Sequence, residues 1–462
     1  MNRYKKLFSN TLIFGIGTFA SKLLVFLLMP IYTAVLSEGE FGIADIVVQT
    51  ANLLIPLVSI GITSAIIRFG LDAAVDKSSV FTVSSTVLLS GFGAGALIAF
   101  AAYLIFPSIG QYIGLVGLYV ITSCVHSLCS QFVRSIERVK LFAVNGVLCT
   151  TITVLANLLF LLVFKMGVTG YILATVVADL SCACFLFFYA RLYRYIKPKR
   201  FDRSLAGDML RYCVPLIPTT VFWWITNVSD RYMVTFFRGE EANGLYAIAY
   251  KIPTVLVLLS TVFMEAWQMS AITEEQRERP DFFGRVFRAF GGLMFIGASG
   301  LIMCSKFLIR LLAAPAYEEA WHYMPVLICA TVFSCFVSFM GTVYMVDKKS
   351  MQSLGTASVG AALNIVLNLA FIPWIGVQGA AVATLVSYLA IFVLRAVNVK
   401  KYIVFPLHGG RIILNTVLLL VQCGLMLWQP AGWYYYQIGM FFAILALNFM
   451  PLIDTVKRIF GK

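Results

Sequence analysis

The chain has 462 residues, of which 60% are hydrophobic and 12% are charged, and its mean hydropathy is +0.90. No soluble globular protein of this length can hide so much apolar surface, so the composition predicts an all-α membrane protein. The net charge is +14. Cytoplasmic loops of membrane proteins are rich in Lys and Arg, so the charge needs no nucleic acid to explain it if the positive residues lie on one side.

Apolar runs follow one another along the whole chain. A helix needs about 20 residues to cross a bilayer core of about 30 Å, and by this measure the chain is a polytopic membrane protein of about fourteen transmembrane helices. The first run lacks a small-residue cleavage site, so we interpret it as a helix and not as a signal peptide. The predicted spans are 10–36, 41–67, 80–106, 111–130, 141–164, 168–190, 212–237, 244–264, 289–305, 323–346, 352–372, 376–394, 412–428 and 434–453.

The positive residues indicate the orientation of these helices. With the N-terminus placed inside, 28 of the 35 Lys and Arg residues fall in inner loops, Arg395 among them, and Lys22, Arg231 and Lys251 lie within the membrane. The outer loops hold Lys165, Arg238, Lys306 and Arg310. We therefore expect a multi-pass protein of the cell membrane with both termini in the cytoplasm.

The two halves of the chain resemble each other. The matching segments are GVTGYILATVV at 167–177 with GVQGAAVATLV at 376–386, and NLLF at 157–160 with NLAF at 368–371. This repetition predicts two parallel six-helix lobes, 1–200 and 201–405, followed by an addition at 406–462 that carries helices 13 and 14. Two lobes related by an axis along the membrane normal leave a cleft between them, on which alternating-access transport depends.

The cysteines and histidines indicate no metal site. Most of the ten cysteines lie inside apolar runs, and the three histidines, at 126, 322 and 408, are far apart in the sequence. This distribution is typical neither of a disulfide framework nor of a zinc site. Cys182 and Cys184 form the closest pair, which helix packing explains.

Positive side chains within the predicted spans are candidates for substrate binding. Lys22 lies in the middle of the first span, Lys251 lies in the eighth, and Arg68 closes the second at its inner end. A charge at a helix centre costs about 2.5–3.5 kcal/mol on insertion scales, so such residues usually face a polar cavity. Together they would suit a phosphate-bearing substrate, and Arg231 is a further candidate. The alternatives are snorkelling for Arg68, internal ion pairs for Lys22 and Lys251, and mutual neutralisation of Arg231 and Asp230.

Several motifs resemble a family of transporters. They are Asp230-Arg231-Tyr, GLYAIAYK at 244–251, Ser21-Lys22-Leu-Leu, Pro30 and the Glu40-Phe-Gly42 turn. With them the whole chain resembles the Wzx-type flippases, the polysaccharide-transport branch of the multidrug/oligosaccharidyl-lipid/polysaccharide exporter superfamily. The resemblance implies a V-shaped transporter that moves an undecaprenyl-diphosphate-linked oligosaccharide to the outer leaflet for capsule, O-antigen or another surface polysaccharide. The implied partners are this lipid-linked oligosaccharide, membrane lipids and polysaccharide polymerase machinery.

The same resemblance implies roles for single residues. Lys22 and Lys251 match basic residues of the related lipid II flippases. A third basic residue of those proteins falls near Pro56, where this chain has none, and Arg68 is the candidate substitute. In the related lipid II flippases, helices 13 and 14 form a groove for the lipid tail, and the resemblance implies the same role here.

Asp230, Asn364, Asn368 and Thr384 form a candidate cation site. Counted from the outer ends of their spans at 1.5 Å per residue, all four lie roughly 6–12 Å below one surface. Carboxylate, amide and hydroxyl oxygens suit a hard cation. The set resembles the sodium site of lipid II flippases, in which an acidic residue stands where this chain has Asn368. The alternative is that the asparagines only bond neighbouring helices, as the repeat-related Asn157 would.

Three questions of function stay open at this point. Asp179 in the sixth span is either a proton carrier or a helix-packing residue, so the coupling ion is Na⁺ or H⁺, and no cofactor is expected. A multidrug exporter of the same superfamily would need an acidic cavity, and a membrane glycan polymerase or ligase would need a large outer loop. The predicted outer loops are short, so we expect a transporter and not an enzyme. The aromatic residues that could stack on sugar rings are Trp223, Trp224, Trp267, Tyr246 and Tyr250.

Overall fold

The structure is a computed structural model that describes residues 26–72, 74–105, 110–273, 279–346 and 350–460. All regular elements in these ranges are helices, which confirms the all-α polytopic fold. Ten of the helices are long and apolar enough to cross a membrane, and the bent pair formed by α11 and α12 would make eleven. The first predicted span, 10–36, lies largely outside the described residues.

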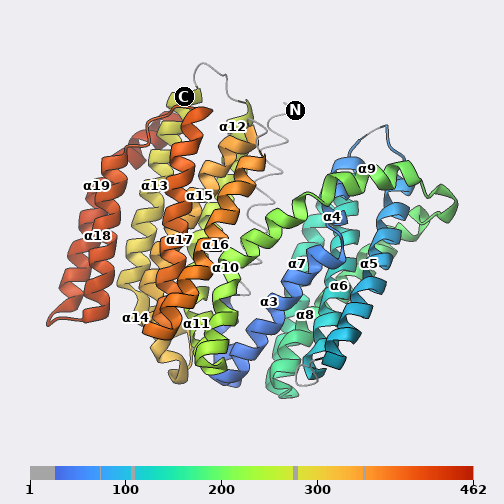
Figure 1. Cartoon of the computed structure of the whole chain (residues 1–462), viewed down its shortest axis with the longest axis horizontal. Coiled ribbons are helices and arrows are strands. Elements are labelled where there is room, and N and C mark those ends of the chain that lie inside the picture. Colours follow the sequence, from blue (N-terminus) through green and yellow to red (C-terminus); the bar gives the residue numbers. More distant parts are fainter. Residues whose placement is uncertain (1–25, 73, 106–109, 274–278, 347–349, 461–462) are drawn as a thin grey trace. The chain divides into compact units, whose positions relative to one another are not determined.

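Contacts divide the chain into two compact units, one within Leu12–Trp224 and one that contains Ile225–Lys462. The division falls inside α10, and the lobe limits at 200 and 405 stay predictions. The helices of the first unit are α2 (Met29–Val35), α3 (Glu38–Val58), α4 (Ile62–Gly70), α5 (Lys77–Ile105), α6 (Gly110–Ser135), α7 (Val139–Asn157), the π-helical turn η2 (Leu158–Val163), α8 (Gly167–Tyr189), α9 (Arg203–Cys213) and the start of α10 (Leu216–Arg238) (Figure 1).

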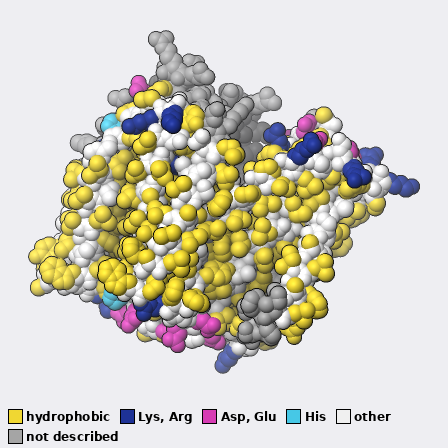
Figure 2. All heavy atoms as spheres, in the orientation of Figure 1, with side chains coloured by type: hydrophobic (Ala, Val, Ile, Leu, Met, Phe, Trp, Pro, Cys, Tyr) yellow, Lys and Arg dark blue, Asp and Glu magenta, His cyan; other side chains and the backbone are white. Residues whose placement is uncertain are grey.

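The second unit begins with the remainder of α10. Its other helices are α11 (Glu240–Lys251), α12 (Thr254–Thr273), α13 (Arg279–Met303), α14 (Ser305–Leu312), η5 (Pro315–His322), α15 (Met324–Val346), α16 (Ser350–Ile375), α17 (Val377–Asn398), α18 (Gly409–Trp428) and α19 (Trp433–Phe460). The central helix is α15, because 83% of its most apolar stretch is buried. On the face shown in Figure 2, hydrophobic side chains cover most of the helix surfaces, and the charged side chains gather near helix ends.

Two of the predicted spans each consist of two helices separated by a break in the backbone. The span predicted at 41–67 is divided into α3 and α4 at Gly61, whose φ of +63° favours glycine. The span predicted at 244–264 is divided into α11 and α12, which meet at 41° around Ile252 and Pro253. Pro253 has no backbone N–H to continue the hydrogen bonds of the helix, which explains the position of the break.

The basic segment between α8 and α9 is anchored to the start of α5. The hydroxyl of Thr82 donates to the carbonyl of Tyr195 at 3.1 Å and accepts from the N–H of Lys197 at 3.0 Å. Arg200 forms a 2.9 Å ion pair with Asp76. Slight burial would raise the pKa of Asp76, but the hydrogen bonds from Arg200 and Ser79 and the charge of Arg200 hold that pKa below its usual value.

At the sequence repeat, both units have the same pair of glycines at a tight helix–helix contact. Gly167 and Gly376 precede α8 and α17 with φ of +56° and +66°, a conformation that strains other residues. Three residues further on, a Cβ on Gly170 would lie 3.3 Å from the carbonyl oxygen of Phe160, and one on Gly379 would lie 2.5 Å from that of Phe371. Each unit therefore contains a helical hairpin whose second helix packs against the end of the first through glycine.

The sequence position of Arg395 predicted an inner loop, and this prediction is wrong. The residue lies inside α17 and only 1% of its surface is exposed. Its guanidinium donates to the carbonyl of Val337 on α15 at 2.8 Å, and to Thr356 and Ser353 of α16 at 3.0 and 3.1 Å. The side chain thus ties three helices together instead of facing the cytoplasm.

Candidate functional site

A fully buried carboxylate lies where α10, α11 and α17 meet. Oδ2 of Asp230 accepts hydrogen bonds from the hydroxyls of Tyr246 at 2.5 Å and Thr384 at 3.2 Å, and all three side chains are 0% exposed. Oδ1 accepts from the N–H of Arg231 at 2.9 Å. A buried charge needs such partners, so α10, α11 and α17 together hold the carboxylate in one orientation.

Two buried asparagines on α16 are linked to the residue that precedes Asp230. Oδ1 of Asn364 accepts from the hydroxyl of Ser229, the residue before Asp230, at 3.1 Å and from Nδ2 of Asn368 at 2.9 Å. Oδ1 of Asn368 and Nδ2 of Asn364 are buried without a hydrogen-bond partner. We call Asp230, Tyr246, Asn364, Asn368 and Thr384 the Asp230 cluster.

The Asp230 cluster has the donors that a hard cation takes. One carboxylate, two amide oxygens and a hydroxyl oxygen are the ligand types that such ions prefer. The buried, unpartnered Oδ1 of Asn368 is the most direct indication, because an orphaned acceptor in the protein interior is costly and a cation would satisfy it. These ligand types therefore suit the predicted sodium site, which stays a prediction.

Helix packing accounts for part of this cluster. Asn364 does join α16 to α10 through Ser229, as the alternative interpretation predicted. The repeat-related Asn157 differs, because its Nδ2 donates to the carbonyl of Thr153 in its own helix at 2.8 Å and does not reach a neighbouring one. Packing alone thus explains Asn364 better than it explains Asn368.

Three of the four predicted substrate-binding residues lie in the part of the chain that the structure describes. Lys22 lies outside the described residues. Arg68, at the end of α4, has its guanidinium 5.1 Å from the ring centre of Tyr212. Lys251 is the last residue of α11, at the break in this span, and is partly exposed.

Arg231 is mostly buried beside Asp230. Its exposed fraction is 7%, and its guanidinium stacks 5.0 Å from the ring centre of Tyr250. A guanidinium over an aromatic face keeps its charge with less hydration than an ammonium does. The positive charge is therefore held in place beside the Asp230 cluster.

Asp179 belongs to a second polar cluster, inside the first unit. The hydroxyl of Ser123 donates to its Oδ2, and Nδ1 of His126 lies 2.8 Å from its Oδ1. Nε2 of His126 lies 2.8 Å from Nδ2 of Asn145 on α7. Asp179 thus bridges α8 to α6 as the packing interpretation predicted, with a titratable partner that a proton carrier would need.

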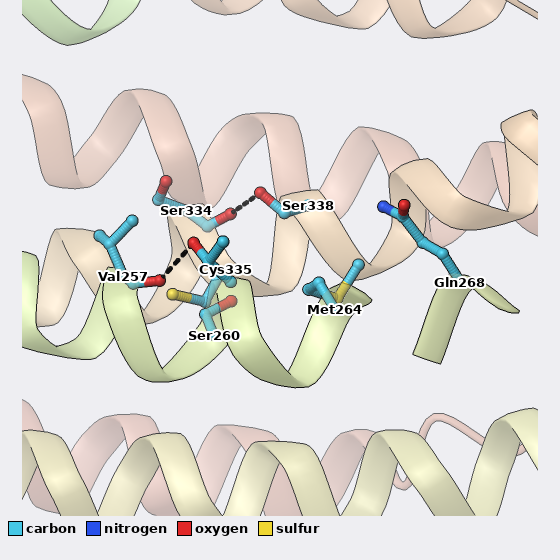
Figure 3. Close-up of a pocket in the computed structure, with 8 residues that line it drawn as sticks. Val257, Ser260, Met264, Gln268, Ser334, Cys335 and Ser338 are labelled. Atoms are coloured by element: carbon cyan, nitrogen blue, oxygen red, sulfur yellow. Dashed lines mark hydrogen bonds between the residues drawn. The ribbon is translucent and has the colours of Figure 1, made fainter. Parts of the chain in front are cut away.

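A cavity of about 220 Å³ lies between α12 and α15. Figure 3 shows the side chains of both helices that point into it. The lining consists of neutral residues, several with hydroxyl or amide groups: Val257, Ser260, Thr261, Met264, Gln268, Ser334, Cys335 and Ser338. Hydroxyl and amide groups of this kind suit a neutral polar ligand.

Two of the aromatic residues considered for sugar stacking are buried and cannot contact a sugar. Tyr246 is 0% exposed and its hydroxyl is bonded to Asp230. Trp267 is 3% exposed and stacks on Phe339 with ring centres 4.8 Å apart. Both residues belong to the interior of the second unit.

Sequence reasoning missed Tyr246 as a partner of Asp230, and it missed His126 and Asn145. Sixteen residues and a helix end separate Tyr246 from Asp230, and His126 and Asn145 lie on different helices from Asp179. The available signal was weak: a histidine inside an apolar span is itself a candidate functional residue.

The final two helices are held to α13 and to each other by buried amides. Ser299 of α13 donates to Oε1 of Gln422 at 2.7 Å, and Asn448 of α19 donates to Oδ1 of Asn415 at 2.6 Å. Such bonds join helices in an apolar environment. The lipid-tail groove implied for α18 and α19 stays a prediction.

Comparison with known proteins identifies the family and the fold. The family model described as "Polysaccharide biosynthesis protein" matches residues 7–267. An uncharacterized membrane protein of Methanocaldococcus jannaschii is 23% identical over 423 residues, covering 83% of this chain and 96% of the relative.

Two solved structures share the fold. One is "Lipid II flippase MurJ, inward closed conformation", with a TM-score of 0.70, 14% identity, and coverage of 96% of this chain and 100% of that one. The other is an inward-facing multidrug resistance MATE family transporter of the MOP superfamily, with a TM-score of 0.66, 15% identity, and coverage of 82% and 95%. Both similarities concern the fold alone.

Proposed function

Because the chain belongs to the polysaccharide biosynthesis protein family, we propose that it is a flippase for an undecaprenyl-diphosphate-linked oligosaccharide. It moves this repeat unit from the inner to the outer leaflet of the cytoplasmic membrane, with both termini in the cytoplasm. The observation that carries the proposal is Lys251, a positive residue at a break within an apolar span. Interrupted helices occur within membranes where the chain lines a cavity or is buried in protein, and an ammonium there can bind a phosphate as a point charge.

Binding in this mechanism is electrostatic. The diphosphate binds Lys251 and Arg231 of the second unit, and Lys22 and Arg68 stay candidates from the sequence. The neutral, hydroxyl-lined cavity between α12 and α15 accepts part of the glycan, while the polyprenyl tail stays in lipid. Nothing covalent is made or broken, so the activity is transport and not catalysis.

A cation gradient returns the protein to its starting state. Sodium would be held by Asp230, Asn364, Asn368 and Thr384, whose oxygens suit a hard cation. When bound, the ion supplies positive charge that favours the ionised carboxylate. Asp179 is the proton-carrying alternative, and the transported repeat unit is delivered to polymerase machinery on the outer side.

Leaflet exchange in liposomes tests the proposal. The purified protein is reconstituted with defined polyprenyl-diphosphate-linked oligosaccharides, and the lipid reaching the outer leaflet is measured against protein-free liposomes. Lys251→Arg should retain more exchange than Lys251→Gln, because the phosphate contact needs charge. Full exchange by Lys251→Gln at a normal protein level would exclude this role of Lys251.

A multidrug exporter is the second candidate function, because a MATE transporter shares the fold. An exporter of organic cations needs acidic residues around its ligand, whereas the residues that line the cavity between α12 and α15 are neutral. The same liposomes loaded with a fluorescent organic cation discriminate the two functions. Ion-driven efflux of the dye without lipid exchange would establish the exporter.

Replacement of sodium by choline at fixed pH tests the coupling ion. Sodium coupling predicts slower exchange in choline, and it predicts that Asp230→Asn removes the difference. Unchanged exchange in choline would leave Asp179 as the coupling residue, and Asp179→Asn would then be expected to abolish the response to a proton gradient.

A further inference from the structure

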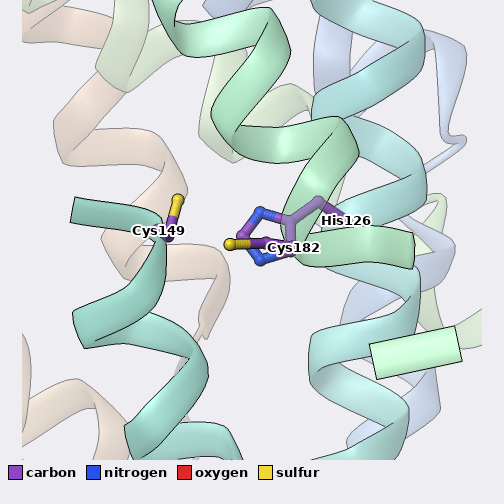
Figure 4. A group of neighbouring side chains, drawn as sticks. All are labelled: His126, Cys149 and Cys182. Carbon is purple, nitrogen blue, oxygen red and sulfur yellow. The ribbon is translucent and has the colours of Figure 1, made fainter. Parts of the chain in front are cut away.

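Three helices of the first unit bring two thiols and an imidazole together. His126 lies on α6, Cys149 on α7 and Cys182 on α8, and one ligand atom of each lies within 4.8 Å of those of the other two. Figure 4 shows the two sulfur atoms beside the imidazole ring. We call these residues, with Asp179, the His126 cluster. It lies in the first unit, whereas the Asp230 cluster lies in the second.

Asp179 supplies a fourth potential ligand. Its Oδ1 lies 2.8 Å from Nδ1 of His126 and 3.9 Å from Sγ of Cys149. Two thiolates, an imidazole and a carboxylate, about 2.0–2.3 Å from a metal, form a tetrahedral donor set for zinc. Because one ligand atom each of His126, Cys149 and Cys182 already lies within 4.8 Å of the other two, binding by these three requires only small movements of side chains on three packed helices.

The imidazole also has the partners that orient a ligating histidine. A histidine that binds a metal through one nitrogen normally donates the other N–H to a carboxylate or a carbonyl oxygen. With the metal bound at Nδ1, on the side of the ligand Asp179, the orienting partner is Asn145 at Nε2. Oδ1 of Asn145 is buried without a hydrogen-bond partner. Rotation of this amide would turn that oxygen toward Nε2–H and satisfy it, which is a second indication that the cluster accommodates a ligated imidazole.

We propose that the His126 cluster is a binding site for a thiophilic divalent cation such as Zn²⁺, with His126, Cys149, Cys182 and Asp179 as ligands. Each thiol releases its proton to solvent when its sulfur binds the metal. Two protons leave as one divalent cation enters, so the net charge of the cluster stays the same. This balance matters inside an apolar bundle, where an added net charge would be costly. The side chains of His126 and Asp179 are 16% and 12% exposed, so the protein does not enclose the cluster completely.

Cobalt is the probe that tests the site. The full-length protein, purified in detergent with a non-thiol reductant, is titrated with Co²⁺ and then with Zn²⁺. Tetrahedral thiolate ligation predicts visible d–d bands and a near-ultraviolet sulfur-to-cobalt charge-transfer band that saturate at one equivalent and disappear when zinc displaces cobalt. Retained zinc, measured by elemental analysis after dialysis, should likewise approach one per chain.

Matched cysteine variants locate the ligands. Cys149→Ser and Cys182→Ser should each remove the charge-transfer band and the retained zinc. Cys184→Ser, two residues further along α8 at an exposed position, should leave both unchanged. Asn145→Val should weaken cobalt binding by about 10- to 100-fold, the usual loss when a partner of a ligating histidine is removed. Size-exclusion elution and thermal unfolding of each variant establish that it is folded.

Three results would overturn the proposal. An absent charge-transfer band in the reduced, folded protein would show that the residues form only a hydrogen-bonded network. A band that survives in both Cys149→Ser and Cys182→Ser would assign the cobalt to other residues. A disulfide between Cys149 and Cys182 in protein purified without reductant, together with no cobalt binding after reduction, would make the pair a redox site.

Discussion

The hydroxyl of Tyr246 lies 2.5 Å from Oδ2 of Asp230, and both side chains are fully buried. Tyr246→Phe removes this donor while keeping the ring, so the carboxylate loses one of its partners. We expect a loss of about 1–3 kcal/mol of folding free energy, the usual cost of leaving a buried polar group without its bond. Thermal unfolding in detergent measures it, with Tyr435→Phe at an exposed site as the control. Equal stability of the two variants would show that the bond contributes nothing.

Asn368→Asp tests the cation site by adding a carboxylate. We expect the sodium concentration for half-maximal exchange to fall by about tenfold, which corresponds to about 1.4 kcal/mol. The physical reason is that a second negative charge beside Asp230 attracts the cation and is costly without it. Asn157→Asp is the matched control, because that residue is equally buried and repeat-related but belongs to the other unit. A sodium dependence that is unchanged by Asn368→Asp would argue against coordination by residue 368.

Arg395 is expected to be irreplaceable by lysine. Its planar guanidinium reaches Val337 on α15 and Thr356 on α16 together, which the single ammonium of lysine cannot do. Each lost hydrogen bond to a charged group costs about 1.5–3 kcal/mol. Arg395→Lys should therefore lower the thermal unfolding midpoint nearly as much as Arg395→Met. The exposed Arg200→Lys should leave the midpoint almost unchanged, and a tolerated Arg395→Lys would contradict the three-helix role.

Gly379→Ala should force α16 and α17 apart. The added Cβ would lie 2.5 Å from the carbonyl carbon and oxygen of Phe371, and a backbone group cannot turn away. Overpacking of this kind costs about 1–3 kcal/mol. Gly424→Ala in α18 is the control, since nothing lies within 4 Å of its Cβ position and alanine favours a helix. Similar unfolding midpoints for the two variants would show that the hairpin relaxes easily.

Reporter fusions test the proposed topology. Fusions after Arg203 and Lys462 should report the cytoplasm and a fusion after Arg238 should report the outside, because inner loops carry most of the Lys and Arg residues. An outside signal at Lys462 would mean an odd number of spans between the termini, and the parallel arrangement of the two lobes would fail with it.

Hydropathy located the spans well because it is a local property of the chain. The span predicted at 323–346 is α15 (Met324–Val346), and the one predicted at 412–428 lies within α18 (Gly409–Trp428). Hydropathy cannot detect a change of backbone direction inside an apolar run, so the breaks at Gly61 and Pro253 were missed. Arg395 was assigned to an inner loop for a related reason. A charged residue near the end of an apolar run is interpreted as a loop residue when its hydrogen-bond partners are not known.

The candidate sites show the same limit. Counting residues at a fixed rise gives depth, so Asp230, Asn364 and Thr384 could be assigned to one level of the membrane. Depth leaves open which helices are neighbours and how each is rotated. Depth alone therefore does not connect Tyr246 to Asp230, and sequence spacing does not show that His126, Cys149 and Cys182 lie together.

The paired glycines at 167 and 170, and at 376 and 379, bear on the history of the chain. Two hairpins with the same left-handed residue and the same close approach to a phenylalanine carbonyl are expected of one ancestral half-length sequence that was duplicated. The polar interiors of the two units differ, with histidine and cysteine beside Asp179 in one and tyrosine and threonine beside Asp230 in the other. The joint between two helices is thus shared by the two units, while the chemistry beside it is different in each.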